Sequence, residues 1–98
     1  MLLGTVIGTV WATRKDPSLV GMTFQIVRET DLDGRPLDNY VVAADAVGAG
    51  VGETVLVAQG SSGRMTALTQ GKAIDAVIMA IVDRLDVDGR AQDVREAA

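Results

Sequence analysis

A glycine-rich run at residues 48–52, Gly-Ala-Gly-Val-Gly, is the first stretch of this chain whose composition suggests chemistry, because such runs often bind nucleotides. The dinucleotide-binding fingerprint requires a further glycine where this chain has Glu53, and a helix directly after it. A Walker loop requires Gly-Lys followed by Ser or Thr, which this run does not contain. The run therefore predicts a flexible connector whose glycines allow close backbone packing, with no nucleotide cofactor.

Two adjacent serines, Ser61 and Ser62, are candidate nucleophiles in a second glycine-containing loop, Gly-Ser-Ser-Gly-Arg at residues 60–64. A serine becomes nucleophilic only beside a general base. The chain has no histidine and no cysteine, and nothing in the sequence places Lys15 or Lys72 near these serines. The two hydroxyls are better explained as caps of a helical turn, and no catalytic residue is predicted.

Two groups of aspartates, within residues 31–38 and 83–88, are candidate metal ligands. The first group lacks the Asp-x-Asp-x-Asp-Gly order and the terminal glutamate of a calcium-binding loop. The second group is typical of a solvated run of charges. We therefore expect no metal site in either stretch.

The elements that carry these loops are short β-strands. Residues 2–13 alternate with period two, and glycines at positions 4 and 8 suggest bends or close backbone approaches. Residues 23–29 and 40–47 are predicted to form an antiparallel hairpin around the Asp33-Gly34 turn, and residues 53–59 form a fourth strand. Residues 74–85 fit an amphipathic helix by periodicity and a buried strand by their β-branched content. Four or five strands in so short a chain favour a small closed barrel.

The composition suggests a self-associating domain. The chain has 98 residues, of which 48% are hydrophobic and only 3% aromatic, so the apolar content is mainly aliphatic. A domain of this size has little interior, and we expect part of this surface to lie at subunit interfaces. The net charge of −4 argues against nucleic acid as a partner.

The sequence also predicts where the protein is located. The N-terminal run has no basic region and contains glycines and threonines, unlike a secretory signal. No uncharged stretch reaches the ~20 residues of a membrane helix. The expected location is the cytoplasm, with no membrane partner.

Three blocks of sequence, in order, resemble the EutN/CcmL family of bacterial microcompartment vertex proteins. The first runs from Gly4 to Lys15 and continues through Leu19-Val-Gly21 to Val27. The second runs from Asp45 to Val57 and into the loop at residues 60–64, and the third comprises residues 74–76 and 81–83. The resemblance covers residues 1–88, with Gly63 and Ala73 standing where alanine and proline are usual in the family.

The resemblance implies a mainly β fold, an OB-like five-stranded β-barrel with one short helix near residues 62–67, assembled as a cyclic homopentamer. It implies that residues 74–85 hold a barrel strand, contrary to their helical periodicity. Residues 1–88 would form the barrel domain. Residues 89–98 are expected to be a polar tail, since their composition disfavours a paired final strand.

The function that the resemblance implies is structural. The pentamer would cap the vertices of a microcompartment shell within the cytoplasm and contact hexameric and pseudohexameric shell proteins. No catalytic residue, cofactor or metal comes with the family.

A closed five-fold ring needs two different complementary patches on each chain. The two glycine-containing loops are the candidates for the pentamer interface or its axis, with Arg64 pairing across the interface with Glu53 or Asp45. Lys15 and Arg35 are the candidate contacts with other shell proteins. The predicted interface residues are Gly48, Gly50, Gly52, Glu53, Gly60, Ser61, Ser62, Gly63 and Arg64.

Two other classes of function stay open at this point. The first is an OB-like barrel that binds single-stranded nucleic acid, for which Trp11, Phe24 and Tyr40 are the available aromatic residues. The second is a non-catalytic subunit of an enzyme complex.

Overall fold

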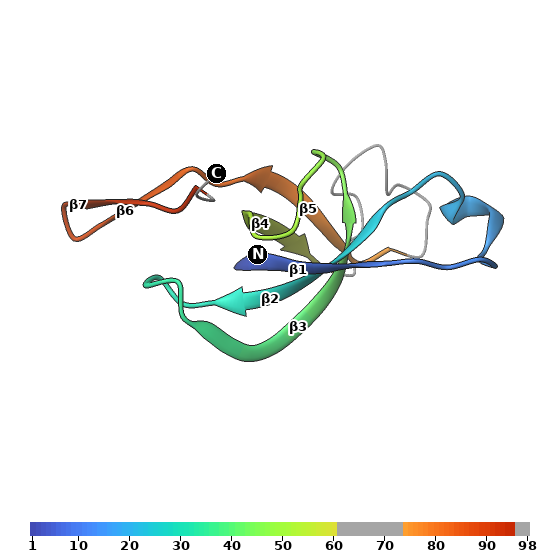
Figure 1. The fold of residues 1–98 in the computed structure, drawn as a ribbon, viewed down its shortest axis with the longest axis horizontal. Coiled ribbons are helices and arrows are strands. Elements are labelled where there is room, and N and C mark those ends of the chain that lie inside the picture. The colour runs from blue at the N-terminus through green and yellow to red at the C-terminus, as the bar shows by residue number, and fades with distance from the viewer. Residues whose placement is uncertain (61–73, 96–98) are drawn as a thin grey trace.

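The computed structural model describes residues 1–60 and 74–95, and within these ranges the chain is almost entirely β-structure (Figure 1). In chain order the elements are β1 (Leu2–Val10), a 3-10 helix η1 (Pro17–Leu19), β2 (Phe24–Thr30), β3 (Pro36–Asp45), β4 (Thr54–Gln59), β5 (Ala76–Ile81), β6 (Arg84–Val87) and β7 (Arg90–Asp93).

The first five strands close into a barrel in the order β1-β2-β3-β5-β4, which confirms the predicted five-stranded barrel. Every neighbouring pair is antiparallel except β3 and β5, which run parallel and share only two residue pairs, Ala44 with Val77 and Asp45 with Ile78. The barrel is therefore partly open between β3 and β5, as in OB folds.

The barrel interior is filled by aliphatic side chains, chiefly valines. Fully buried residues come from each of the strands β1, β2, β4 and β5: Val6, Val27, Val55, Val57 and Ile78. A second buried cluster lies outside the barrel, where Ala44, Ile74 and Val77 pack against Leu19, Met22 and Phe24. The two clusters together cover both faces of β5.

Because β5 is buried on both faces, the helical periodicity of residues 74–85 is misleading. Ala76 and Ile78 point into the barrel, whereas Val77 points into the second cluster, and all three are buried. A strand buried on both faces loses the alternation of apolar and polar residues that identifies half-buried strands. The helix indicated by periodicity is wrong, and the strand implied by the resemblance is confirmed at Ala76–Ile81.

The predicted hairpin of the second and third strands is confirmed, but β3 begins at Pro36, four residues earlier than expected. The turn is short because the Asp31 carboxylate accepts hydrogen bonds from the backbone N–H groups of Asp33 and Arg35, both at 2.9 Å. Pro36 is accommodated as the first residue of its strand.

The C-terminal region departs most from the sequence-based expectation. A paired final strand was not expected after Gly89, yet β7 pairs with β6 from Arg84–Asp93 to Val87–Arg90. Asp88 and Gly89 both have positive φ, 52° and 76°, as a two-residue hairpin turn requires. Arg90–Asp93 is polar, as its composition indicates, but it is paired as a strand, because the turn aligns β7 with β6.

The short helix implied near residues 62–67 lies outside the described residues. The described residues contain one helical turn, η1, in the connection between β1 and β2. The Asp16 carboxylate caps it by accepting hydrogen bonds from the backbone N–H and the hydroxyl of Ser18 at 2.9 and 2.7 Å.

The close approach of β1 to β2 depends on Gly4. A Cβ added there would lie 2.6 Å from the carbonyl oxygen of Arg28 and 2.6 Å from Cγ1 of Val27. At Gly8, also on β1, an added Cβ would meet only Cδ1 of Ile26 at 3.5 Å, an ordinary contact. The predicted significance of the β1 glycines therefore belongs to Gly4.

We predict that Gly4→Ala lowers the free energy of unfolding by roughly 1–3 kcal/mol, since a backbone carbonyl cannot move aside without breaking the strand pairing. Gly8→Ala is the matched control, and should change it by less than about 1 kcal/mol. Urea unfolding at one protein concentration, followed by circular dichroism, measures both. Equal midpoints for the two variants would contradict the steric explanation.

Candidate functional site

The loop between β3 and β4, residues 46–53, carries the first group of predicted interface residues and is held in one shape by Asp45. The Asp45 carboxylate accepts hydrogen bonds from the backbone N–H groups of Val47 and Gly48, at 3.0 and 2.9 Å. Gly48 and Gly52 have φ values of 75° and 93°, which side chains disfavour. These two glycines are thus required by the path of the loop.

Glu53 closes the other end of the loop. Its Oε1 accepts a hydrogen bond from the backbone N–H of Gly50 at 2.6 Å. The backbone of Gly52 donates to the carbonyl of Val6, and the backbone of Val6 donates to the carbonyl of Glu53, at 2.8 and 3.0 Å. The loop is therefore fastened to β1 on both sides of its last turn.

A buried glutamine, Gln25 on β2, fastens the middle of the loop. Its side chain is 6% exposed. The side-chain Nε2 donates to the carbonyl of Ala49 at 2.8 Å, and Oε1 accepts from the hydroxyl of Thr9 on β1 at 2.7 Å. The sequence predicts a flexible connector, and the structure instead shows a loop anchored by side chains distant in sequence.

Arg64, the predicted ionic partner of Glu53 or Asp45, lies outside the described residues, as do Ser61, Ser62 and Gly63. Gly60, the last described residue before them, donates its backbone N–H to the carbonyl of Asp75 at 3.0 Å. Gly60 thus lies beside the start of β5. Pairing of Arg64 with either acid remains a prediction.

Lys15 and Arg35, the predicted shell contacts, are both exposed but are not brought together. Lys15 belongs to the connection between β1 and β2, and Arg35 to the turn between β2 and β3. These two segments project from opposite ends of the barrel (Figure 1). The two residues would therefore contact different regions of a neighbouring surface, or different neighbours.

Large apolar side chains are exposed on the β1–β2 connection and on β3. On the β1–β2 connection, Trp11 is 88% exposed, and Val10 and Val20 are exposed near it in sequence. On β3, Tyr40 and Val42 are 54% and 52% exposed. Exposed apolar groups of this size mark interaction surfaces more often than accidents of packing. The exposure of Trp11 favours a role at an interface over one in the core.

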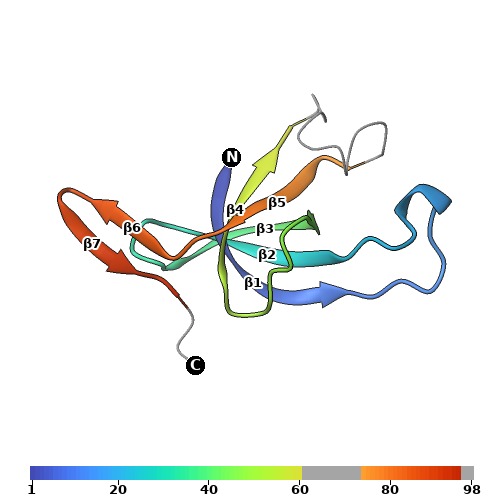
Figure 2. The ribbon, with the colours of Figure 1, turned by 90° about the horizontal axis from the view of Figure 1, so that it is seen from above.

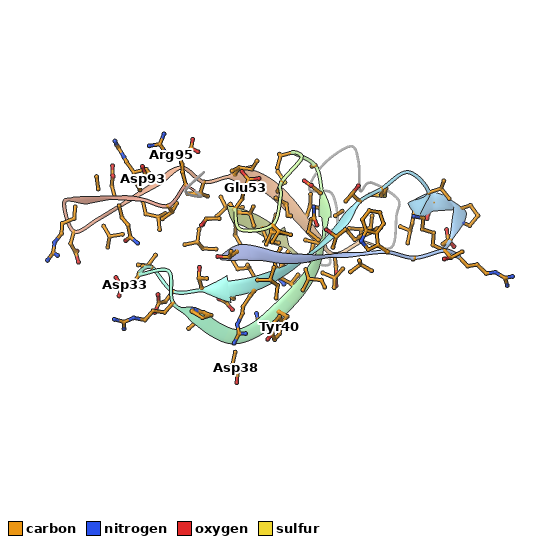
Figure 3. All side chains as sticks on the ribbon, viewed as in Figure 1. Asp33, Asp38, Tyr40, Glu53, Asp93 and Arg95 are labelled. Carbon is orange, nitrogen blue, oxygen red and sulfur yellow. The ribbon has the colours of Figure 1, made fainter. Side chains whose placement is uncertain are left out.

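Arg28 braces the exposed part of β3. Its Nε donates to the carbonyl of Leu37 at 3.0 Å, and its guanidinium lies 4.9 Å from the ring centroid of Tyr40. Figure 3 shows Tyr40 and Asp38 on the outer side of the curved β3 strand. Tyr40 is therefore held in position while remaining open to contact.

The titration behaviour of two exposed acids reflects local structure. The pKa of Asp93 is lowered to about 2, chiefly by hydrogen bonds from the side chain and backbone of Arg95. The pKa of Asp16 is lowered by its hydrogen bonds from Ser18. Both carboxylates thus stabilise local turns and neither is placed for acid–base chemistry.

Among the described residues there is no group of three side chains placed to hold a metal ion. Within the same ranges, no helix is long and apolar enough to cross a membrane. The hollows in the described surface are shallow, and none brings a nucleophile beside a base. The features that stand out are an anchored loop and exposed apolar residues, both suited to protein contacts.

Comparison with protein families matches residues 1–83 to the EutN/CcmL model, described as ethanolamine utilisation protein EutN/carboxysome. The carboxysome shell vertex protein CcmL of Gloeobacter violaceus is 44% identical over 90 residues, covering 92% of this chain and 90% of its own length. The microcompartment shell vertex protein PduN of Salmonella typhimurium is also 44% identical, covering 87% of this chain and 98% of its own length.

Solved structures agree with these matches. The structure of Gloeobacter violaceus CcmL superposes with a TM-score of 0.86 at 44% identity, covering 93% of this chain and 94% of that one. The pentameric microcompartment shell protein GrpN of Rhodospirillum rubrum superposes with a TM-score of 0.79 at 40% identity, covering 89% of this chain and 99% of that one.

We predict that Glu53→Ala loosens the β3–β4 loop, because the backbone N–H of Gly50 loses its acceptor. The free energy of unfolding should fall by about 1 kcal/mol, and amide exchange at Gly50 should become faster. Glu53→Gln retains an acceptor oxygen and is the control, with slow exchange preserved. Unchanged exchange at Gly50 in the alanine variant would show that the carboxylate does not hold the loop.

Proposed function

The chain belongs to the EutN/CcmL family, and we propose that five copies of it form the pentamer that closes a vertex of a bacterial microcompartment shell. The observation that carries this proposal is the match of nearly the whole chain to shell vertex proteins, in sequence and in barrel structure. The protein is accordingly a component of the shell, located at its corners.

A purely structural role, without catalysis, agrees with the residue types. Histidine and cysteine, which supply most general bases and thiol nucleophiles, are absent from the sequence. The acids of the predicted interface, Asp45 and Glu53, already accept hydrogen bonds from loop N–H groups. Their role is thus to shape a surface.

The anchored β3–β4 loop is suited to the interior of the ring. Five copies of a loop can converge on an axis only if each has a fixed shape and small side chains. Gly48, Gly50 and Gly52 supply the small residues, and hydrogen bonds to the side chains of Asp45, Glu53 and Gln25 fix the shape of the loop. Gly60 and the residues Ser61, Ser62, Gly63 and Arg64 complete the proposed interface.

The β1–β2 connection is suited to contact the hexameric and pseudohexameric shell proteins around the vertex. It carries three exposed residues, Trp11, Lys15 and Val20. Tryptophan is over-represented among the residues that contribute most of the binding energy at protein interfaces. Arg35, in the turn between β2 and β3, would provide a separate contact.

Binding of single-stranded nucleic acid receives no comparable support. An OB-like barrel binds a strand through neighbouring aromatic platforms in a positive groove. Trp11 and Tyr40 lie on different segments, and Tyr40 is occupied by Arg28. The net charge of −4 opposes a polyanion.

The test of the pentamer is the native mass of the purified protein, measured by mass spectrometry or light scattering. We predict the mass of five chains. A stable single chain at micromolar concentration would refute the assignment as a vertex subunit.

We predict that Trp11 stays exposed in the free pentamer and becomes buried when the shell closes around it. Trp11 is the only tryptophan in the chain, so it can be replaced by 5-hydroxytryptophan, whose fluorescence is excited separately from that of other shell proteins. Acrylamide should quench it in the pentamer and much less in closed shells formed with shell hexamers.

The matched variants for this contact are Lys15→Glu and Lys15→Arg. Charge reversal should leave the pentamer intact but reduce its incorporation into shells, whereas the arginine variant should be incorporated normally. Quenching that is equally weak before and after shell closure would mean that Trp11 is buried within the pentamer, contrary to the proposal.

A further inference from the structure

The chain contains two Asp-Gly pairs, Asp33-Gly34 in the turn between β2 and β3 and Asp88-Gly89 in the turn between β6 and β7. Aspartate followed by glycine is especially prone to spontaneous isomerisation, because glycine has no side chain to shield its backbone nitrogen from the neighbouring carboxyl group. All four of these residues are exposed. Residue type alone therefore gives the two pairs the same reactivity, and a difference between them must come from the folded structure.

The reaction is an attack of the glycine nitrogen on the aspartate side chain. The nitrogen bonds to Cγ of the protonated aspartate, and the carboxyl hydroxyl leaves with the amide proton as one water. The succinimide ring that results takes up one water again. Addition at the main-chain carbonyl breaks the bond from that carbonyl to the glycine nitrogen, so the chain then runs through the side-chain carboxyl group as isoaspartate. The mass is unchanged, and the backbone is longer by one carbon.

Asp31 holds the backbone nitrogen that would attack Asp33. The N–H of Gly34 donates to the main-chain carbonyl of Asp31 at 3.1 Å. The Asp31 carboxylate accepts from the backbone N–H groups of Asp33 and Arg35, both at 2.9 Å. Three successive amides of this turn are therefore bound to one residue, and the nitrogen of Gly34 can reach Cγ of Asp33 only after its hydrogen bond breaks.

The nitrogen of Gly89 has no such restraint. Its N–H donates a hydrogen bond to none of the residues that the structure describes. Asp88 has a φ of 52°, and within residues 1–60 and 74–95 it is the only residue other than glycine with a positive φ. This left-handed conformation is unfavourable for a residue with a Cβ, so opening of the turn relieves strain at Asp88.

The hairpin that carries Asp88 also opens at low cost. β6 and β7 have four residues each, pair only with each other among the described strands, and project from the barrel (Figure 2). A two-stranded hairpin is at best marginally stable in water, so local unfolding releases its turn often. The turn that carries Asp33 joins two strands of the closed barrel and is released less often.

We propose that Asp88-Gly89 is a site of spontaneous isoaspartate formation in the folded protein, and that Asp31 protects Asp33-Gly34 from the same reaction. The unbound nitrogen of Gly89, the strained φ of Asp88 and the easily opened hairpin all favour the first pair. The modification requires only water. It is a property of the chain itself and does not rest on the proposed vertex function.

Isomerisation at Asp88 would disrupt the pairing of β6 with β7. Val87 and Arg90 pair across a two-residue turn, and the positive φ angles of Asp88 and Gly89 align the strands. Isoaspartate adds one backbone carbon to this turn, which then no longer has two-residue geometry. The hairpin of an aged chain is therefore expected to be less ordered than that of a newly made one.

The test is peptide mapping of the purified wild-type protein after incubation for several weeks in mildly acidic buffer. Trypsin releases residues 85–90, which contain Asp88, and a separate peptide that begins at Glu29 and contains Asp33. Isoaspartate is detected in each peptide by chromatographic separation of the isomer and by labelling with an isoaspartyl methyltransferase. We expect at least about fivefold more isoaspartate at Asp88 than at Asp33, the factor that one net hydrogen bond provides.

Two variants and an unfolded control show whether the structure decides the difference. Asp31→Ala removes the carboxylate that holds the β2–β3 turn, so isoaspartate at Asp33 should rise severalfold while residues 85–90 react as in the wild type. Asp88→Gly tolerates the positive φ without a carboxyl group, so the isomer should disappear from residues 85–90. In wild-type protein unfolded in urea, the two pairs should react at similar rates. Circular dichroism confirms that both variants keep the barrel.

Several results would overturn the proposal. The first is a folded wild-type protein with no isoaspartate at Asp88, or with as much at Asp33 as at Asp88. The second is an unfolded protein with the same ratio as the folded one, since the sequence would then decide the difference. An Asp31→Ala variant that is folded and leaves Asp33 unmodified overturns the protective role of Asp31. None of these results bears on the pentamer, whose mass is measured separately.

Discussion

The structure depends on how the barrel closes. β3 and β5 meet through only two residue pairs, at Ala44 and Asp45, and this short parallel contact completes the ring of strands. A longer contact would leave β3 fully paired but would bury more of a chain that has little interior. Closure at one end of β3 keeps the core intact and leaves the other end of the strand exposed, so the fold itself creates a surface that another chain can cover.

Much of this fold could be predicted from alternation and turn residues, because the two faces of each of the strands β1 to β4 differ in burial. The exceptions have physical causes. β5 is covered on both faces, so Val77 is as buried as Ile78 and no alternation remains. β7 does not pack on a hydrophobic core, so its sequence has no apolar alternation. Its pairing follows from the positive φ angles of Asp88 and Gly89. The alternation of apolar and polar residues therefore identifies strands that have one buried and one solvent-exposed face. It does not identify strands whose two faces are both buried or both exposed.

The sequence proposes residues for the candidate site but does not reveal what holds their loop in place. The glycines at 48–52 were recognised, yet what holds their loop is Gln25, whose amide reaches the carbonyl of Ala49 from a different strand. The spacing of residues in the sequence does not predict this hydrogen bond, because the bond forms only when the barrel is closed. The exposure of Trp11 and of the β3 strip is similarly a property of the folded surface. The lack of histidine and cysteine removes the commonest general base and the thiol nucleophile from the sequence.

The hairpin of β6 and β7 shows how a polar segment can form paired strands. Its turn residues, Asp88 and Gly89, have the positive φ angles that a two-residue hairpin requires, so the two strands align without a core of their own. Its ion pairs, Arg84 with Asp86 and Asp93 with Arg95, are exposed and contribute little stability. Since a two-stranded hairpin is at best marginally stable alone, this one depends on its base, where the backbone N–H of Val82 donates to the carbonyl of Thr54.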